Sequence, residues 1–309
     1  MEPQVGTAAV RPAAPACYIV RTMLLAIDIG NTQTAVGLFD GDALVGRWTL
    51  STCADDTADE ISLKLSGLLA EGAPDSSRAS DAASGAPGTP RIDAACIACV
   101  VPPLTEAWQV AAARTCALRP DQSPDSQPAR AQARPDRVLV VGPGVRTGLA
   151  MRFDNPAEVG ADRVADAVAA VDKYGTPVVV VDLGTATNIE AVDADGAFVG
   201  GVIAPGLATT ASDLASHAAR LPLVELGFPR HAIGTNTVDA MRSGIMYGEL
   251  ARIDGLVRRV LDELGCDAPV VATGGYASIM ASLSETVTAH EPDLTLTGLR
   301  LIHERNRTR

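Results

Sequence analysis

The chain has 309 residues, 47% of them hydrophobic and only 3% aromatic, with a formal net charge of -12. This length allows one large domain or two domains of about 150 residues, and we start from two. A core of Val, Leu, Ile and Ala favours the α/β class, in which a parallel or mixed sheet is covered by helices. The acidic charge excludes a protein that tracks a phosphate backbone with clustered Lys and Arg, so we expect no nucleic-acid partner.

Residues 1–22 are rich in Ala and Pro and hold no continuous apolar segment, so they make a poor signal peptide. Two interpretations stay open for them, a disordered extension or a true start at Met23. No run of the sequence reaches the roughly 18 apolar residues that a membrane span needs, and we expect no membrane association. The six cysteines show no disulfide framework, which favours a cytoplasmic location.

The first half of the chain, residues 23–142, alternates strands and helices. A strand that ends at Asp28 begins a hairpin, and it is followed by a helix expected at 56–70, a strand at 92–101, a helix at 103–116 and a strand at 137–141. The segments 71–90 and 117–136 hold too little apolar surface to offset the entropy of ordering, and we expect both to be surface insertions. Cys96 and Cys99 have CxxC spacing, but alternate strand positions direct them to opposite faces, which favours two small buried residues over a metal pair.

The second half, residues 143–309, opens with the stretch FDNPAEVGADRVADAVAAVDKYG at 153–175. We expect Asn155 and Pro156 to open a helix, because Pro suits a first turn. Its buried face should carry four valines: Val159, Val164, Val168 and Val171. Asp162 and Arg163 project about 100° apart on such a helix and cannot both be buried in the same direction. One can act as a general base while the other anchors an anion; the alternative is a solvated or ion-paired surface turn.

The sequence contains an internal repeat. The stretch LLAIDIGNTQTAVGLFDGDALVG from residue 24 matches VVVVDLGTATNIEAVDADGAFVG from residue 178. Each reads as an apolar run, an Asp-x-Gly turn with small polar residues, a second strand, an Asp-Gly turn and a third strand. The repeat predicts that one β-hairpin core is used twice, once per domain, with a ligand site between the domains.

The Asp-x-Gly turns suggest what that ligand is. Glycine at the bend lets backbone amides approach a phosphate, and the neighbouring Thr and Asn side chains add donors. A carboxylate at the same bend would repel phosphate unless a cation such as Mg²⁺ lay between them, so we expect Asp28 and Asp182 to hold cations beside a nucleotide. The alternative is that each Asp and Gly only makes a turn. Gly274 and Gly275 would let the backbone lie against a base or ribose, although a plain strand-to-helix turn fits them equally well.

Six motifs occur in the order seen in the type III pantothenate kinases: DIGNTQT at 28–34, GADR at 160–163, DLGTAT at 182–187, GGVIAPG at 200–206, GTNTVDAM at 234–241 and ATGG at 272–275. The chain resembles this family from about Met23 to Asn306, apart from the two insertions. The family belongs to the actin and sugar-kinase superfamily. The resemblance therefore implies two duplicated ribonuclease-H-like domains, residues 23–142 and 143–309, with an ATP cleft between them.

The resemblance also implies ATP-dependent phosphorylation of pantothenate, the first step of coenzyme A biosynthesis, by a homodimer. The residues implied for ATP are Asp28, Ile29, Gly30, Asn31, Thr32, Gln33, Thr34, Ala35, Thr185, Gly274 and Gly275, with Asp28 holding Mg²⁺ through ATP. Asp182 would bind a monovalent cation, K⁺ or NH₄⁺. The residues implied for pantothenate are Phe153, Gly160, Ala161, Asp162, Arg163 and Thr237, with Asp162 as the catalytic base.

The chain departs from the family at four positions. Phe153 stands where many relatives carry Tyr, and Thr235 stands where Lys is usual. Asn188 and Glu190 stand where Thr and Asp are commoner. These departures bear on the affinity for the substrate.

Two other functions are compatible with the resemblance. One is a catalytically silent regulatory homologue, which the intact Asp28, Asp162 and Asp182 disfavour, because a pure binding protein does not need all three. The other is a small-sugar kinase of the same superfamily. Arg163 disfavours it, because a guanidinium suits the carboxylate of pantothenate better than a sugar hydroxyl.

Overall fold

The computed structural model describes residues 23–71, 92–117 and 135–307. The N-terminal extension expected at 1–22 lies outside the described residues. So do the two expected insertions, 71–90 and 117–136, except for a few residues at their ends.

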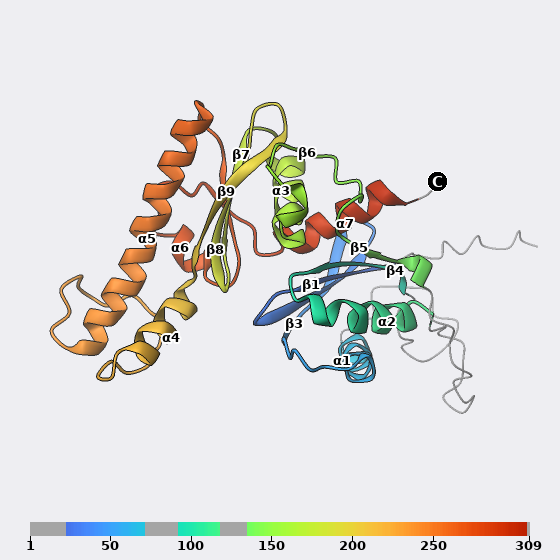
Figure 1. Cartoon of the computed structure of the whole chain (residues 1–309), viewed down its shortest axis with the longest axis horizontal. Helices are drawn as coiled ribbons and strands as arrows, with labels where there is room; N and C mark the ends of the chain where they lie inside the picture. Colours follow the sequence, from blue (N-terminus) through green and yellow to red (C-terminus); the bar gives the residue numbers. More distant parts are fainter. Residues whose placement is uncertain (1–22, 72–91, 118–134, 308–309) are drawn as a thin grey trace, which may run out of the picture.

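The described residues form two β-sheets (Figure 1). The first has the order β3 (Ala43–Ser51), β2 (Gln33–Asp40), β1 (Met23–Ile29), β4 (Ile92–Cys99) and β5 (Val138–Val140). The second has the order β11 (Ala289–His290), β10 (Val270–Thr273), β7 (Val178–Leu183), β8 (Ala186–Val192), β9 (Ala197–Pro205) and β6 (Ala150–Met151). In the first sheet β1, β2 and β3 form an antiparallel meander, and β4 and β5 run parallel to β1. In the second β7, β8 and β9 form the same meander, β10 and β11 run parallel to β7, and β6 pairs with β9. The predicted duplication is confirmed.

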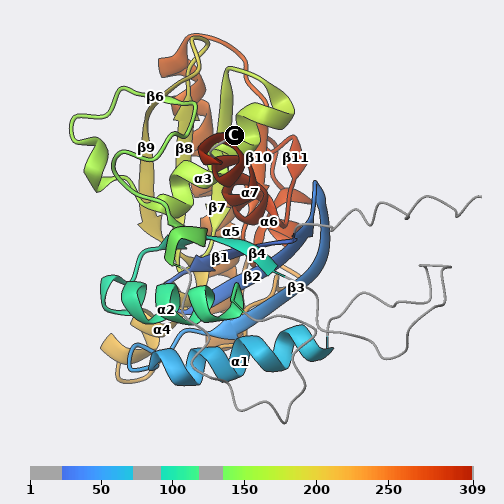
Figure 2. The same cartoon turned by 90° about the vertical axis from the view of Figure 1, so that its right-hand side faces the viewer.

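The helices cover both faces of each sheet. In Figure 2, α1 (Ala58–Glu71) and α2 (Thr105–Thr115) lie under the first sheet. In Figure 1, α4 (Leu207–His217), α5 (Thr237–Leu264) and α6 (Ala277–Ala281) lie on the outer side of the second sheet. Between the two sheets lie α3 (Ala161–Tyr174) and α7 (Leu294–Asn306). Short 3-10 helices occur at Pro102–Leu104, Pro135–Arg137 and Pro156–Glu158.

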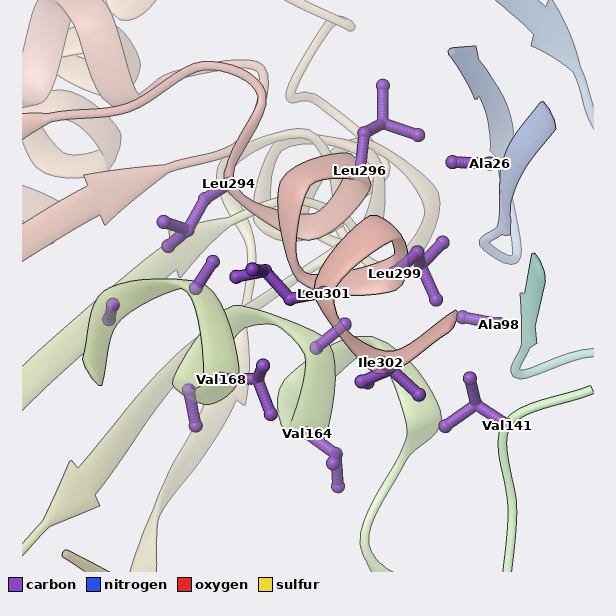
Figure 3. Close-up of a cluster of buried hydrophobic side chains, with 14 of the residues drawn as sticks. Ala26, Ala98, Val141, Val164, Val168, Leu294, Leu296, Leu299, Leu301 and Ile302 are labelled. Atoms are coloured by element: carbon purple, nitrogen blue, oxygen red, sulfur yellow. The ribbon is translucent and has the colours of Figure 1, made fainter. Parts of the chain in front are cut away.

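Alternation along β1 explains these layers. Leu25, Ile27 and Ile29 pack with α1 and α2, whereas Leu24 and Ala26 belong to the central cluster with α3 and α7. Figure 3 shows this central cluster, with Ala26 and Ala98 of the first sheet facing the leucines of α7. The same alternation separates Cys96 from Cys99, which pack in different clusters, as expected. Both are free cysteines.

The last helix of the chain returns to the first sheet. α7 packs against β1, β4 and α3, so a helix from the second half helps to cover strands of the first. Its crossing with α3 requires a glycine, since a Cβ at Gly298 would lie 1.9 Å from the carbonyl oxygen of Ala165. The domain boundary between residues 142 and 143 separates the strands of the two sheets but not all of their helices, and it stays a prediction.

The strands and helices expected in the first half occur, with ends displaced by a few residues. The expectation that Asn155 and Pro156 open the α-helix is wrong. Asn155 caps only the 3-10 turn Pro156–Glu158, Val159 is extended, and the α-helix begins at Ala161 after Gly160. None of the described helices is long and apolar enough to cross a membrane.

Candidate functional site

An aspartate lies next to the end of the first meander strand of each sheet, on the side that faces α3 and α7. Asp28 follows Ala26 along β1, and Asp182 follows Val180 along β7, so both point toward the central layer. Burial, with the charges of Asp162 and Asp182, raises the pKa of Asp28 well above its ordinary value. Burial and then the charge of Asp162 raise the pKa of Asp182 to about 7. The fold therefore gathers three carboxylates whose negative charges oppose one another.

These carboxylates could bind a cation whose remaining ligands come from a bound substrate. Oδ1 of Asp28 is buried and has no hydrogen-bond donor. Within the described residues there is no group of three or more His, Cys, Asp or Glu side chains that could hold a metal by themselves. Mg²⁺ commonly takes one or two protein carboxylates and completes its shell with phosphate oxygens and water. One or two of these aspartates match that need.

The turn after β1 carries most of the residues expected to contact ATP. Gly30 donates its N–H to the carbonyl of Gln33 at 3.0 Å, and a Cβ at Gly30 would lie 2.9 Å from that oxygen. The side chains of Asn31, Thr32 and Gln33 are exposed. Those of Ile29 and Thr34 are buried and that of Ala35 is half-buried, so Ile29 and Thr34 could meet a ligand only through their backbone.

The two hairpin turns meet each other. The hydroxyl groups of Thr32 and Thr185 lie 2.9 Å apart, although 153 residues separate them in the chain. Gly274 is pressed against β7, because its φ is +94° and a Cβ there would lie 2.5 Å from Oδ1 of Asp182. Gly275 has open space beside it. The structure thus brings Asp28, Asp182 and the three glycine-containing turns to one region.

The first turn of α3 adds Asp162 to this region. Gly160 is the N-cap, and Ala161, Asp162 and Arg163 form the first helical turn. Oδ1 of Asp162 accepts the backbone N–H of Arg163 at 2.9 Å. Burial raises the pKa of Asp162, while the N–H and charge of Arg163 oppose the rise. The helix N-terminus also favours the ionised carboxylate.

Arg163 points in a different direction from Asp162, as expected, but it is not in a surface turn. It is buried, its Nε donates to Oε1 of Glu190 at 2.9 Å, and its guanidinium lies 5.8 Å from the ring centroid of Phe198. Phe153 packs against the same ring with centroids 6.2 Å apart. A Cβ at Gly201 would lie 3.0 Å from the Arg163 side chain. Arg163 is therefore held in place from several sides.

Sequence reasoning treated Asn188 and Glu190 only as departures, yet both belong to the site. Asn188 is the cross-strand neighbour of Asp182, and its side chain acts to lower the pKa of that carboxyl. Oε2 of Glu190 is buried without a donor, and burial raises the pKa of Glu190 to about 8 against the opposing charge of Arg163. Period-two alternation along β8 could have indicated that both face α3.

Asp166 was missed altogether. It is buried and accepts the hydroxyl of Thr295 from α7 at 2.7 Å. Burial, with the charges of Asp182 and Glu190, raises its pKa well above the ordinary value. Its spacing of four residues from Asp162 would have placed both on one face of α3.

Thr237 is not brought to the same region. It is exposed and starts α5, after the N-cap Asn236. In Figure 1 the beginning of α5 lies beside α4, and the second sheet separates it from α3. Within one chain, Thr237 is therefore apart from Gly160, Asp162 and Arg163.

Comparisons with known proteins agree with the motifs. A family model described as Type III pantothenate kinase matches residues 24–259. The chain is 43% identical over 284 residues to a Type III pantothenate kinase of Frankia alni, covering 92% of this chain and 100% of that protein. It is 42% identical over 287 residues to Type III pantothenate kinase 2 of Symbiobacterium thermophilum, covering 92% and 97%. The solved structure of ethanolamine utilization protein EutJ from Carboxydothermus hydrogenoformans shares the fold, with a TM-score of 0.50 at 15% identity over 95% of this chain and 92% of that one. The chain belongs to the type III pantothenate kinase family, as its motifs predicted.

Proposed function

We propose that this protein phosphorylates pantothenate with ATP to give 4'-phosphopantothenate and ADP, the first step of coenzyme A biosynthesis. The observation that carries the proposal is the position of Asp162. It lies at the N-terminus of α3, where it shares an electrostatic environment with Asp28 and Asp182 at the ends of the two repeated strands. Membership of the type III pantothenate kinase family supports the same substrate.

Asp162 is the proposed general base. As the phosphoryl group is transferred, the acceptor hydroxyl of pantothenate loses its proton, and a carboxylate in contact with that hydroxyl can take it. Burial raises the pKa of Asp162 and makes its carboxylate more basic, while the N–H and charge of Arg163 oppose part of that rise. A base whose pKa lies nearer the working pH transfers protons more effectively.

The two hairpin turns are the proposed phosphate site. The backbone N–H groups after Gly30 and Gly184 and the hydroxyls of Thr32 and Thr185 are donors on facing turns. Gly274 would hold its turn against Asp182, and the open space beside Gly275 would leave room for the sugar or base of ATP.

Two cations are part of the proposal. Asp28 would hold Mg²⁺ together with phosphate oxygens, and its buried, unpartnered Oδ1 supports this role. Asp182 would hold K⁺ or NH₄⁺. When bound, these cations neutralise the charge of the transferred phosphoryl group. They would also offset the burial and the charge repulsion that raise the pKa of both aspartates.

Arg163 is the proposed anchor for the carboxylate of pantothenate. Its Nε is taken by Glu190, so its terminal N–H groups would meet the substrate. Phe153, packed beside Phe198, would line the same pocket without the hydroxyl of a Tyr. Gly160 and Ala161 would contribute their backbone.

We also propose a homodimer in the cytoplasm. Thr237 lies across the second sheet from Asp162, so it could join a pantothenate pocket only if a second copy supplied it. The chain near the start of α5 exposes large apolar side chains, with Leu223 at 74% and Ile233 at 85% exposed, and Val238 on the helix itself. Such a surface suits an interface between copies.

The proposal is tested by coupled detection of ADP release, comparing pantothenate with a panel of small sugars. We expect release with pantothenate alone. Release with a sugar instead would favour the sugar-kinase alternative, and no release with any acceptor would favour the silent homologue. Sedimentation of the purified protein tests the dimer separately.

A further inference from the structure

A buried carboxylate lies on the face of the second sheet that the proposed chemistry does not use. Glu249 of α5 is 4% exposed, and its Oε1 accepts the hydroxyl of Thr187 at 2.6 Å. Its Oε2 is paired with the guanidinium of Arg252. Arg252 in turn donates to the carbonyl oxygen of Pro205 at 2.5 Å. The network joins α5 to β8 and to the end of β9.

These two attachment points, on β8 and β9, lie beside the turn Gly184–Thr185. Thr187 lies two residues after Thr185, and Pro205 is the neighbour of Ala186 in the β8–β9 ladder. Gly206 continues the contact, because its N–H donates to the carbonyl of Thr185 at 3.1 Å and a Cβ there would lie 2.4 Å from the carbonyl oxygen of Gly184. The Glu249–Arg252 pair therefore fixes β8, which begins directly after the turn, and the end of β9, whose next residue Gly206 contacts the turn.

Glu249 can act on the site only through this turn. Alternation along β8 directs Thr187 toward α5, whereas Asn188 faces α3 and the carboxylate cluster. A buried ion pair contributes little net stability compared with apolar side chains of the same volume, but its hydrogen bonds fix the geometry.

We propose that Glu249, together with Arg252, is a positioning residue that sets the phosphate-binding turn Gly184–Thr185. The inference rests on the proposed function, because that function assigns the turn to the phosphates of ATP. A turn that moves by about 1 Å can cost on the order of a hundredfold in rate, so the effect of losing this brace should be measurable.

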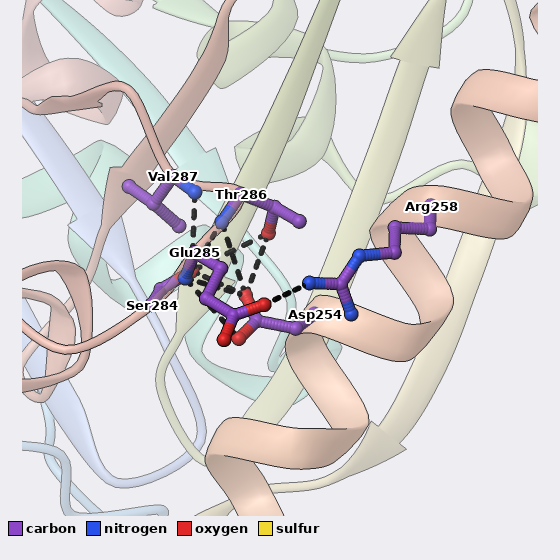
Figure 4. Close-up of polar contacts among 6 residues, drawn as sticks. All are labelled: Asp254, Arg258, Ser284, Glu285, Thr286 and Val287. Atoms are coloured by element: carbon purple, nitrogen blue, oxygen red, sulfur yellow. Dashed lines mark hydrogen bonds and ion pairs between the residues drawn. The ribbon is translucent and has the colours of Figure 1, made fainter.

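Asp254 provides a matched control on the same helix. It is 7% exposed and accepts the hydroxyls of Ser284 at 2.6 Å and Thr286 at 2.8 Å (Figure 4). The adjacent Arg258 pairs with Glu285 of the same segment. Asp254 thus holds residues 284–286 in place, which are not part of the phosphate turn.

The experiment compares Thr187→Val, Thr187→Ser, Glu249→Gln and Asp254→Asn by steady-state kinetics in both substrates and by thermal unfolding. We expect Thr187→Val and Glu249→Gln to lower kcat/KM for ATP by about tenfold or more, with the KM for pantothenate unchanged. Thr187→Ser, which keeps the hydroxyl, should retain wild-type kinetics. Asp254→Asn should lower the Tm and leave the kinetic constants unchanged.

Wild-type kinetics in both Thr187→Val and Glu249→Gln would overturn the inference, and so would an equal kinetic loss in Asp254→Asn. If Glu249→Gln does not fold, the comparison of Thr187→Val with Thr187→Ser decides.

Calorimetric binding of a non-hydrolysable ATP analogue separates this inference from the proposed function. If the wild-type protein binds the analogue but does not phosphorylate pantothenate, the proposed function fails. The inference then stands if Thr187→Val weakens analogue binding relative to Thr187→Ser, and falls if it does not. A wild-type protein that binds no analogue would overturn both.

Discussion

Arg163 and Glu190 form a buried ion pair, with Nε of the arginine 2.9 Å from Oε1 of the glutamate. Glu190 is fully buried, and its second oxygen has no donor. The arginine of the GADR motif is thus tied to the second sheet before any substrate binds. This pair has consequences for the pH dependence of stability and for the interpretation of mutations at residue 163.

The first prediction concerns pH. Burial raises the pKa of Glu190 from 4.5 to about 8, so between these values the folded protein binds more protons than the unfolded chain. The free energy of unfolding should therefore fall as pH rises through this range. Asp182, with a pKa raised to about 7, acts in the same direction.

Thermal unfolding across this pH range, in buffer without Mg²⁺ or ATP, measures the effect. We expect the Tm to decline with rising pH in the wild-type protein and to decline less in Glu190→Gln, which cannot ionise. A Tm that rises with pH in the wild-type protein would contradict these pKa directions.

The second prediction concerns Arg163. Arg163→Ala should raise the KM for pantothenate through loss of a charge-assisted contact. It also leaves the buried carboxyl of Glu190 without the Arg163 donor, which costs about 1 to 3 kcal/mol of stability, as for an unsatisfied buried polar group. The double variant Arg163→Ala/Glu190→Met, which replaces the unpaired carboxyl with an apolar side chain, should recover stability while the KM stays high. If the double variant also regained the wild-type KM, Arg163 would not contact the substrate.

The third prediction concerns the crossing of α3 and α7. Gly298→Ala would place a methyl group against the carbonyl of Ala165 and should destabilise the protein by about 1 to 3 kcal/mol, typical of overpacking. Gly244→Ala on the exposed face of α5 meets no atom within 4 Å. It should be neutral or stabilising by about 0.5 to 1 kcal/mol, as expected for a helix interior. Denaturant unfolding of both variants makes the comparison, and equal effects would mean that the crossing tolerates a side chain.

Much of the architecture could be predicted because local sequence patterns indicate it. The repeated apolar run ending in Asp-x-Gly predicted both hairpins, and Asp28 and Asp182 lie at equivalent ends of β1 and β7. The exact start of α3 was harder, because Asn155 and Pro156 form a real cap, but of a short 3-10 turn. A capping pattern does not give the length of what it caps.

What could not be predicted depends on tertiary contacts. Glu190 meets Arg163 only because α3 packs on β8, and Asp166 meets Thr295 only because α7 returns across 129 residues to lie beside α3. Nothing in the spacing of these residues shows which helix will cover which sheet. Thr237 likewise lies at the exposed start of α5, so within one chain it is apart from the residues of the other motifs.

The fourth prediction concerns the monovalent cation. If Asp182 holds K⁺ beside the phosphates, turnover should depend on K⁺ or NH₄⁺ and fall sharply when Na⁺ replaces them, because Na⁺ prefers shorter ligand distances. Steady-state rates in KCl, NH₄Cl and NaCl at equal concentration measure this dependence. Equal rates in all three salts would remove the proposed role from Asp182.

The fifth prediction tests the central claim, that Asp162 takes the proton of the acceptor hydroxyl. Asp162→Asn keeps the size of the side chain and removes the base. Its kcat should fall by about 10²- to 10⁴-fold, while binding of an ATP analogue, which the hairpin turns provide, stays nearly unchanged.

The most direct measurement is single-turnover phosphorylation of pantothenate by wild-type protein and Asp162→Asn at saturating ATP, because it isolates the chemical step from product release. The account predicts a rate constant for Asp162→Asn that is lower by at least about a hundredfold. A near-normal rate would contradict it and would indicate a loose, metaphosphate-like transition state that proceeds without a base.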